Sequence, residues 1–384
     1  MPYITIAQSP RFHQISFDDI IAGVVDMNQV VIDNHTNTRT RYTKEISAKM
    51  LEQFNLEHML RELKLFNIKH EKLSAEQRQN LYHTYYIPKR SGGVRRIDEP
   101  LPILMEALRE LKEILEKSFF AKYHTAAYAY VKGRSTVHAV KKHQQNESQW
   151  FLKMDLTNFF GSTSFDFTMK QLKMIFPFSE VVKLADGEME LAKAINLCFL
   201  NGGLPQGTPI SPMLTNLVMI PIDHYLFTTL RKYDERNFVY TRYADDMLIS
   251  CKVDFDWRKI QAYLNEVFGK FETPYLVNEK KTHYGSRAGS NWNLGVMLNK
   301  DNVITIGHKN KKLLRAMVDH YLKDRMNGVK WPLNDMQVLS GHLNYHEMVE
   351  GERALDFLDT VNKKYSANLK LCLKKDIGAA MRGE

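Results

Sequence analysis

Two adjacent aspartates, Asp245 and Asp246, constrain this chain more than any other feature of its sequence. They lie between two apolar runs, residues 238–241 and 247–250, a pattern that predicts a β-hairpin with both carboxylates at its tip. Adjacent ionised carboxylates repel each other, so one pKa should rise unless a multivalent cation neutralises both. The pair therefore indicates either a divalent metal site or a plain polar turn, because Asp is also a common turn residue.

A third carboxylate favours the metal site. Residues 150–155 have the pattern of a short buried strand that ends in Asp155. A strand-end aspartate and a hairpin pair can converge on one place in a fold. Three carboxylates on rigid strands suit two Mg²⁺ ions about 3.5–4 Å apart, with Mn²⁺ as a substitute, and this spacing clamps the attacking and leaving oxygens in phosphoryl transfer.

Several blocks of the sequence resemble, in order, the motifs of reverse transcriptases, and the resemblance is closest to bacterial enzymes of the group II intron, retron and defence-associated types. The palm motifs are matched by the blocks 152–160, 203–212, 243–246, 278–282 and 293–296. Upstream, residues 87–97 are similar to the fingertip hairpin of the family, and residues 130–135 to the block that follows it. The resemblance runs from about Tyr85 to Val296.

The resemblance implies an α+β fold, the right-hand polymerase fold of fingers, a palm with an antiparallel sheet and a helical thumb, with a helical N-terminal extension. We expect the extension at 1–75, the fingers at 76–150, the palm at 151–303 and the thumb at 304–384. Part of the fingers is expected to be inserted in the palm between Asp155 and Gln206.

Apolar periodicity predicts individual helices. In the extension, residues 46, 50 and 54 form one apolar stripe and Leu56, Leu60 and Leu63 form a second. Ser74 and Gln77 resemble a capping box and predict a helix that runs to Tyr85. A further helix is expected after Pro102, with its buried face formed by Leu104, Leu108, Leu111 and Leu115.

RNA-templated DNA synthesis is the activity that the resemblance implies, with dNTPs joined to a primer 3′-hydroxyl. Asp155, Asp245 and Asp246 would then be both catalytic residues and metal ligands. Lys281 would donate a proton to pyrophosphate, although an exposed lysine without such a role is common. A catalytically idle, RNA-binding scaffold that retains the fold remains an alternative, because a fold does not guarantee activity.

Two cations and one aromatic ring are candidates for binding the nucleotide. Lys89 and Arg95 flank a Ser-Gly-Gly turn, so a hairpin would aim both at one pocket and suit nucleotide phosphates. A solvated basic turn is the alternative. Phe160 follows Asp155 where the family carries a steric gate against the ribose 2′-hydroxyl; without the resemblance it would be a core residue like Phe159.

A Pro-Gln-Gly turn holds two further candidates. Gly207 lets backbone approach a ligand closely, and the resemblance makes Gln206 a contact to the incoming nucleotide or the template. Tyr243, beside the acidic pair, would either support the primer terminus or simply pack.

Charge and composition indicate the partners. The 53 basic against 44 acidic residues give a net charge of +9, which favours a polyanion. In the thumb, the basic cluster Lys309, Lys311, Lys312 and Arg315 would hold the backbone of an RNA template and DNA product, although such a cluster is often just a solvated helix face. A dedicated noncoding RNA used in antiviral defence is one option for the template. Without a signal peptide or membrane span, and with three dispersed cysteines, we expect a cytoplasmic protein and no membrane partner.

Overall fold

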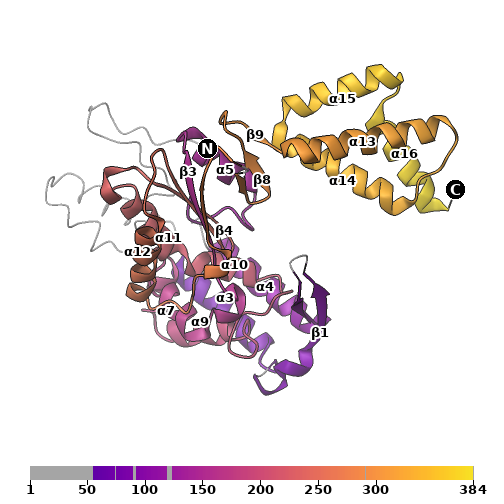
Figure 1. Ribbon diagram of the computed structural model, residues 1–384. Helices are drawn as coiled ribbons and strands as arrows, with labels where there is room; N and C mark the ends of the chain where they lie inside the picture. Colours follow the sequence, from indigo (N-terminus) through magenta and orange to yellow (C-terminus); the bar gives the residue numbers. More distant parts are fainter. Residues whose placement is uncertain (1–54, 74, 90–91, 119–122, 290, 384) are drawn as a thin grey trace, which may run out of the picture. The chain divides into compact units, whose positions relative to one another are not determined.

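The computed structural model describes residues 55–73, 75–89, 92–118, 123–289 and 291–383 (Figure 1). The chain divides into two compact units. The first holds the described residues of Met1–Arg134 together with Leu152–Ile249 and Phe255–His283, and the second holds those of Ser135–Phe151, Ser250–Asp254 and Tyr284–Glu384. Among the residues just given, no helix combines the length and the apolar character that a membrane crossing requires.

The predicted hairpin and the predicted strand-end aspartate lie in one four-stranded sheet. The strand order is β4-β5-β3-β6, with β3 (Trp150–Asp155), β4 (Val239–Tyr243), β5 (Asp246–Cys251) and β6 (His283–Ser286). Ala244 and Asp245 alone join β4 to β5, so the predicted hairpin is confirmed, as is the strand that ends in Asp155. Five consecutive residues of β5 are buried, which shows that both faces of this strand are covered and explains its continuous apolar run.

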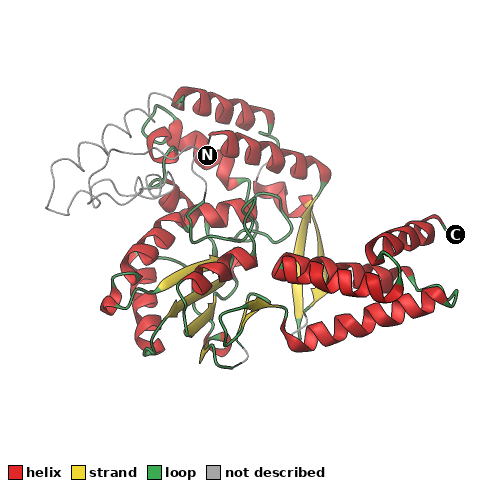
Figure 2. Ribbon diagram, turned by 90° about the horizontal axis from the view of Figure 1, so that it is seen from above, coloured by secondary structure: helices red, strands yellow, loops and turns green. Residues whose placement is uncertain are grey.

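Helices surround these strands in the first unit (Figure 2). Helices α3 (Leu56–Lys69) and α4 (Pro102–Ser118) confirm two of the predicted leucine stripes, and all four leucines predicted for α4 have no exposed surface. Asn55 caps α3 by accepting a hydrogen bond from the His58 amide at 2.8 Å. The other helical segments of this unit are η2 (Ala75–Leu81), α6 (Phe159–Ser162), α7 (Phe165–Leu172), α8 (Phe178–Val181), α9 (Gly187–Asn196), α10 (Ser211–Val218), α11 (Ile220–Leu230), η3 (Tyr233–Glu235), α12 (Trp257–Lys270) and η4 (Glu279–Lys281).

A two-stranded antiparallel ribbon, β1 (Tyr82–Pro88) and β2 (Val94–Pro100), stands clear of the four-stranded sheet (Figures 1 and 2). The prediction of a helix running to Tyr85 is therefore wrong, because the 3₁₀ segment η2 ends at Leu81 and β1 begins at Tyr82. Residues 83–87 are mostly aromatic or β-branched and pair along their whole length with β2, so strand pairing outweighs the local capping signal. Ser74, like the apolar stripe 46–54, lies outside the described residues.

The second unit combines a small sheet with a group of helices. Its three strands have the order β7-β8-β9 and are antiparallel, with β7 (Trp292–Asn293), β8 (Val296–Leu298) and β9 (Ile304–Thr305). Helix α5 (Thr136–Gln145) contacts β8 and β9. Helices predicted within residues 304–384 are confirmed from Gly307 onward, because Ile304 and Thr305 form β9. They are α13 (Gly307–Met326), α14 (Leu333–Glu350), α15 (Glu352–Tyr365) and α16 (Leu369–Arg382), and α14 packs against each of the other three.

Candidate active site

The tip of the β4–β5 hairpin presents the two adjacent aspartates. Ala244 enters the turn with a φ of 57°, in the left-handed region that residues with a β-carbon avoid. This conformation costs an alanine about 1–2 kcal/mol, so the surrounding structure has to hold it. Ala244 itself is 5% exposed, and Asp246 opens β5 as its one exposed residue. The hairpin tip is thus a strained turn with a packed base and an accessible acidic side.

Asp155 reaches the same place from the end of β3. The amide of the next residue, Leu156, donates a hydrogen bond to the Asp245 carbonyl at 3.0 Å, which holds the strand end against the hairpin tip. The Asp155 carboxylate accepts two hydrogen bonds from the Lys281 ammonium, at 3.0 and 2.9 Å. The structure therefore brings together all four residues that the sequence predicted as catalytic.

Nearby positive charge does not fully compensate the three carboxylates of the cluster, and the pKa values of two of them are raised. Burial raises the pKa of Asp245, and the nearby Asp155 adds to this increase. Burial, followed by repulsion from Asp245 and Asp155, raises the pKa of Asp246 to about 6. The hydrogen bond from Lys281 to Asp155 in turn raises the pKa of Lys281, so this lysine stays protonated. A cation placed among the three carboxylates would favour their ionised forms.

The donor set fits a hard divalent cation. Carboxylate oxygens are ligands that Mg²⁺ prefers, and the Lys281 ammonium already occupies a position where Asp155 binds positive charge. In the described part of the chain, no three His, Cys, Asp or Glu side chains are already placed to ligate one ion. Asp155, Asp245 and Asp246 are the residues that would hold such an ion, with Lys281 beside Asp155.

The β1–β2 ribbon brings a second cation to the cluster. Arg95 pairs with Ile87 across the ribbon, and its positive charge lowers the pKa of Asp245, opposing the effect of burial. Lys89 lies at the exposed end of the ribbon, where its amide donates to the Gly93 carbonyl at 2.9 Å. The charge of Arg95 therefore acts on the acidic cluster, whereas Lys89 is exposed at the end of the ribbon.

The Pro-Gln-Gly turn is fastened to the same ribbon. The Asp98 amide in β2 donates to the Gln206 carbonyl at 2.7 Å. Gly207 has a φ of +118°, and a β-carbon there would lie 2.8 Å from the Asp98 carbonyl oxygen. The close approach that the sequence suggested at Gly207 is therefore made by the protein's own β2 strand.

Aromatic rings line the approach to the acids. Phe160, in α6, is half-buried, whereas Phe159 is 3% exposed and packs on Tyr275. The Phe160 ring lies 6.2 Å from that of Tyr130, whose pKa is raised by burial and then by Asp245 and Tyr243. Tyr243 is half-buried beside the tip. Sequence reasoning did not single out Tyr130, although it lies in a block that resembled a family motif.

The predicted basic cluster opens helix α13 of the second unit. Lys309, Lys312 and Arg315 are exposed. Lys311 is half-buried and forms an ion pair of 2.7 Å with Glu350, whose side chain is 1% exposed. The three exposed cations can meet a polyanion, whereas Lys311 is engaged in holding α13 to α14.

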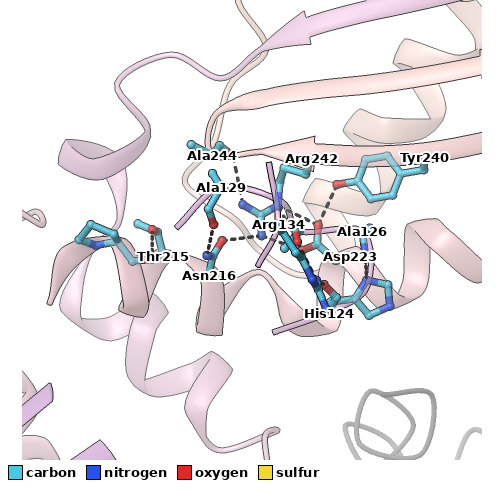
Figure 3. A network of polar contacts seen from close by, with 12 residues as sticks. His124, Ala126, Ala129, Arg134, Thr215, Asn216, Asp223, Tyr240, Arg242 and Ala244 are labelled. Atoms are coloured by element: carbon cyan, nitrogen blue, oxygen red, sulfur yellow. Dashed lines mark hydrogen bonds and ion pairs between the residues drawn. The ribbon is translucent and has the colours of Figure 1, made fainter. Parts of the chain in front are cut away.

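A buried polar network behind the hairpin was not predicted from the sequence. Arg242 in β4 and Asp223 in α11 are both fully buried and form an ion pair of 2.7 Å (Figure 3). Tyr240 donates to Asp223 at 2.8 Å, and Asn216 in α10 accepts from Arg242 at 3.2 Å. The sequence did hold a signal for this network: Arg242 lies within an apolar strand segment and Asp223 within an apolar helix segment.

Comparison with known proteins identifies the family. The family described as "Reverse transcriptase (RNA-dependent DNA polymerase)" matches residues 87–310, more than half of the chain. The chain belongs to the reverse transcriptase family. The predicted α+β right-hand polymerase fold is therefore confirmed, and so is the assignment to the RNA-directed DNA polymerases.

Two curated relatives of this reverse transcriptase come from Escherichia coli. Retron Ec83 reverse transcriptase of Escherichia coli is 28% identical over 306 residues, which cover 77% of this chain and 90% of that protein. Retron Ec73 reverse transcriptase of the same species is 27% identical over 292 residues, covering 74% and 87%. Among solved structures, telomerase from Candida albicans is 13% identical over 77% of this chain and 63% of that one, with a TM-score of 0.42, a likeness too weak to support any conclusion.

Proposed function

We propose that this reverse transcriptase joins dNTPs to a primer 3′-hydroxyl by two-metal-ion phosphoryl transfer, with Asp155, Asp245 and Asp246 as the metal ligands. The observation that carries the proposal is the hydrogen bond of 3.0 Å from the Leu156 amide to the Asp245 carbonyl, since it sets two distant acidic segments side by side. Bound Mg²⁺, or Mn²⁺ in its place, would lower the pKa of the primer hydroxyl and neutralise charge on the triphosphate.

Each remaining candidate residue has a role in this proposal. Arg95 and Lys89 bind the phosphates of the dNTP, for which their charge and their position on one ribbon suit them. Lys281, held protonated by Asp155, donates a proton to the leaving pyrophosphate. Gln206 contacts the nucleotide or the template, and Tyr243 supports the primer terminus.

Phe160 acts in the proposal as a steric gate, and its exchange for valine should relax selection against ribonucleotides. The half-buried ring lies beside that of Tyr130, and in this proposal it excludes the ribose 2′-hydroxyl. We expect kcat/KM for an rNTP, relative to the matching dNTP, to rise by about tenfold or more, equivalent to about 1.4 kcal/mol. Phe159→Leu is the matched control, because this neighbouring ring lies in the core and its loss should change stability but not the ratio. An unchanged ratio in Phe160→Val would refute the gate.

We extend the proposal to the biological role: a dedicated noncoding RNA serves as the template, and the DNA product acts in antiviral defence. Support comes from the relatives, which are named as retron reverse transcriptases, and from the exposed cations Lys309, Lys312 and Arg315. In this scheme the segment 304–384 is the thumb that holds the template–product duplex. The division into 1–75, 76–150 and 151–303 for the extension, fingers and palm belongs to the same proposal.

The test is to purify the protein from its native host and sequence the RNA and DNA that co-purify, for the wild type and for Asp245→Asn. The proposal expects one RNA species with complementary DNA for the wild type, and the same RNA without DNA for the variant. Protection against phage should disappear with the DNA. RNA without DNA in both samples would instead support the RNA-binding scaffold.

A further inference from the structure

The hairpin tip needs a restraint that its own sequence does not supply. Ala244 holds a φ of 57° without the freedom of a glycine. The next two residues are aspartates, and adjacent carboxylates repel each other when both are ionised. Strain and repulsion both favour opening of the turn, so some contact has to keep it closed.

Arg242 makes that contact. Its Nη1 donates to the Ala244 carbonyl at 3.1 Å, while Nη2 donates to Asn216 at 3.2 Å and to Asp223 at 2.7 Å, and Nε donates to Asp223 at 2.9 Å (Figure 3). The planar guanidinium therefore bonds acceptors on three residues at once and directs one donor at the strained residue. A lysine ammonium has no such fixed fork.

The side chains that hold the other donors of the Arg242 guanidinium lie on helices. Asp223 lies on α11 and Asn216 on α10, and the Asn216 side chain also donates to the Ala129 carbonyl at 2.8 Å. The Arg242 backbone is held by the segment 126–128, because its amide donates to the Ala126 carbonyl at 2.7 Å and its carbonyl accepts from the Tyr128 amide at 2.8 Å. Several segments therefore fix Arg242 in the orientation in which it bonds the Ala244 carbonyl.

We propose that Arg242 is a positioning residue for catalysis: its bond to the Ala244 carbonyl holds the hairpin tip in the strained conformation that presents Asp245 to the metal ions. This inference rests on the proposed role of Asp245. The guanidinium then has two roles. Its ion pair with Asp223 stabilises the fold, and its hydrogen bond to the Ala244 carbonyl sets the geometry of the aspartates.

The chain offers a matched pair of variants. Arg242→Lys keeps a positive charge for Asp223 but gives up the simultaneous bonds to Ala244 and Asn216. Tyr240→Phe removes another hydrogen bond to the same Asp223 and leaves the tip contact intact. Both variants should lower the unfolding midpoint, so a difference between them in exchange or in kcat reports on the bonds of Arg242 to Ala244 and Asn216.

Two measurements decide the matter. Hydrogen exchange without substrate, read in peptides that contain Leu156 and residues 243–247, should accelerate about tenfold in Arg242→Lys and stay as in the wild type in Tyr240→Phe. In primer extension with Mg²⁺, kcat should fall about tenfold or more in Arg242→Lys while KM for the dNTP changes less than about twofold, and Tyr240→Phe should keep the wild-type kcat.

A double variant tests whether the loss of kcat in Arg242→Lys can be rescued. Glycine adopts a positive φ without strain, so adding Ala244→Gly to Arg242→Lys should recover part of the lost kcat. If Arg242→Lys does not fold, Asn216→Ala tests how the guanidinium is held, because it removes one acceptor of the fork and leaves the ion pair with Asp223 and the bond to Ala244 in place. Exchange in residues 243–247 should then rise above that of Tyr240→Phe, and exchange equal to that of Tyr240→Phe would overturn the positioning role.

Equal exchange and equal kcat losses in Arg242→Lys and Tyr240→Phe would overturn the positioning role. The exchange result is independent of chemistry, so it stands even if Asp245→Asn proves active and the proposed function fails.

Discussion

Replacing Asp245 with asparagine is expected to lower the rate of RNA-templated DNA synthesis by about 10³-fold or more, equivalent to about 4 kcal/mol of transition-state stabilisation. The exchange preserves the shape of the side chain and removes one of the clustered negative charges. Because carboxylates would hold the divalent cation in the proposed mechanism, the loss should fall on the chemical step. Asp155→Asn should have an effect of the same size.

The measurement is single-turnover primer extension with saturating template and dNTP, together with a separate titration of template binding. Template affinity should stay within about threefold of the wild type, since Asp245 is proposed to bind metal rather than RNA. Asp234→Asn is the control: this aspartate forms an exposed ion pair with Arg236 at 2.7 Å, outside the acidic cluster, and its positive φ of 51° suits asparagine. Synthesis at the wild-type rate by either Asp155→Asn or Asp245→Asn would contradict the metal assignment.

The second large effect is on stability. Asp223→Asn should reduce the free energy of unfolding by about 3–5 kcal/mol, because it leaves the fully buried Arg242 guanidinium without its counter-charge. The isosteric exchange creates no cavity, so the loss measures the charge. In thermal unfolding this corresponds to a midpoint about 10 °C lower.

Glu188→Gln provides the comparison for Asp223→Asn. Glu188 pairs with Lys173 at 2.5 Å, but both side chains are well exposed, and such a surface pair contributes less than about 1 kcal/mol. A loss in Asp223→Asn no larger than in Glu188→Gln would mean that the buried pair is not needed to hold β4 against α11.

The strands of the site could be predicted because their signals are local. The acidic pair follows one apolar run and precedes another, and Asp155 closes a third, so each side chain is placed at a strand end by the sequence around it. The leucine stripe of α4 is equally local. Resemblance to a family then supplied what periodicity could not, namely that these strand ends meet.

Features that depend on partners distant in sequence were missed or misread. The capping signal near Gln77 carried no information about β2, whose pairing turns the following residues into a strand. The pairing of Arg242 with Asp223 joins two segments whose hydrophobic patterns gave no reason to connect them. The bond from Lys281 to Asp155 likewise appears only when η4 and β3 are seen together.

The missing β-carbon of Gly207 has one last consequence. No side chain fits between this turn and the Asp98 carbonyl. The ribbon bearing Arg95 and the loop bearing Gln206 are therefore in direct main-chain contact. Any side chain at position 207 would therefore push apart the two segments that carry Arg95 and Gln206, two residues proposed to bind the nucleotide.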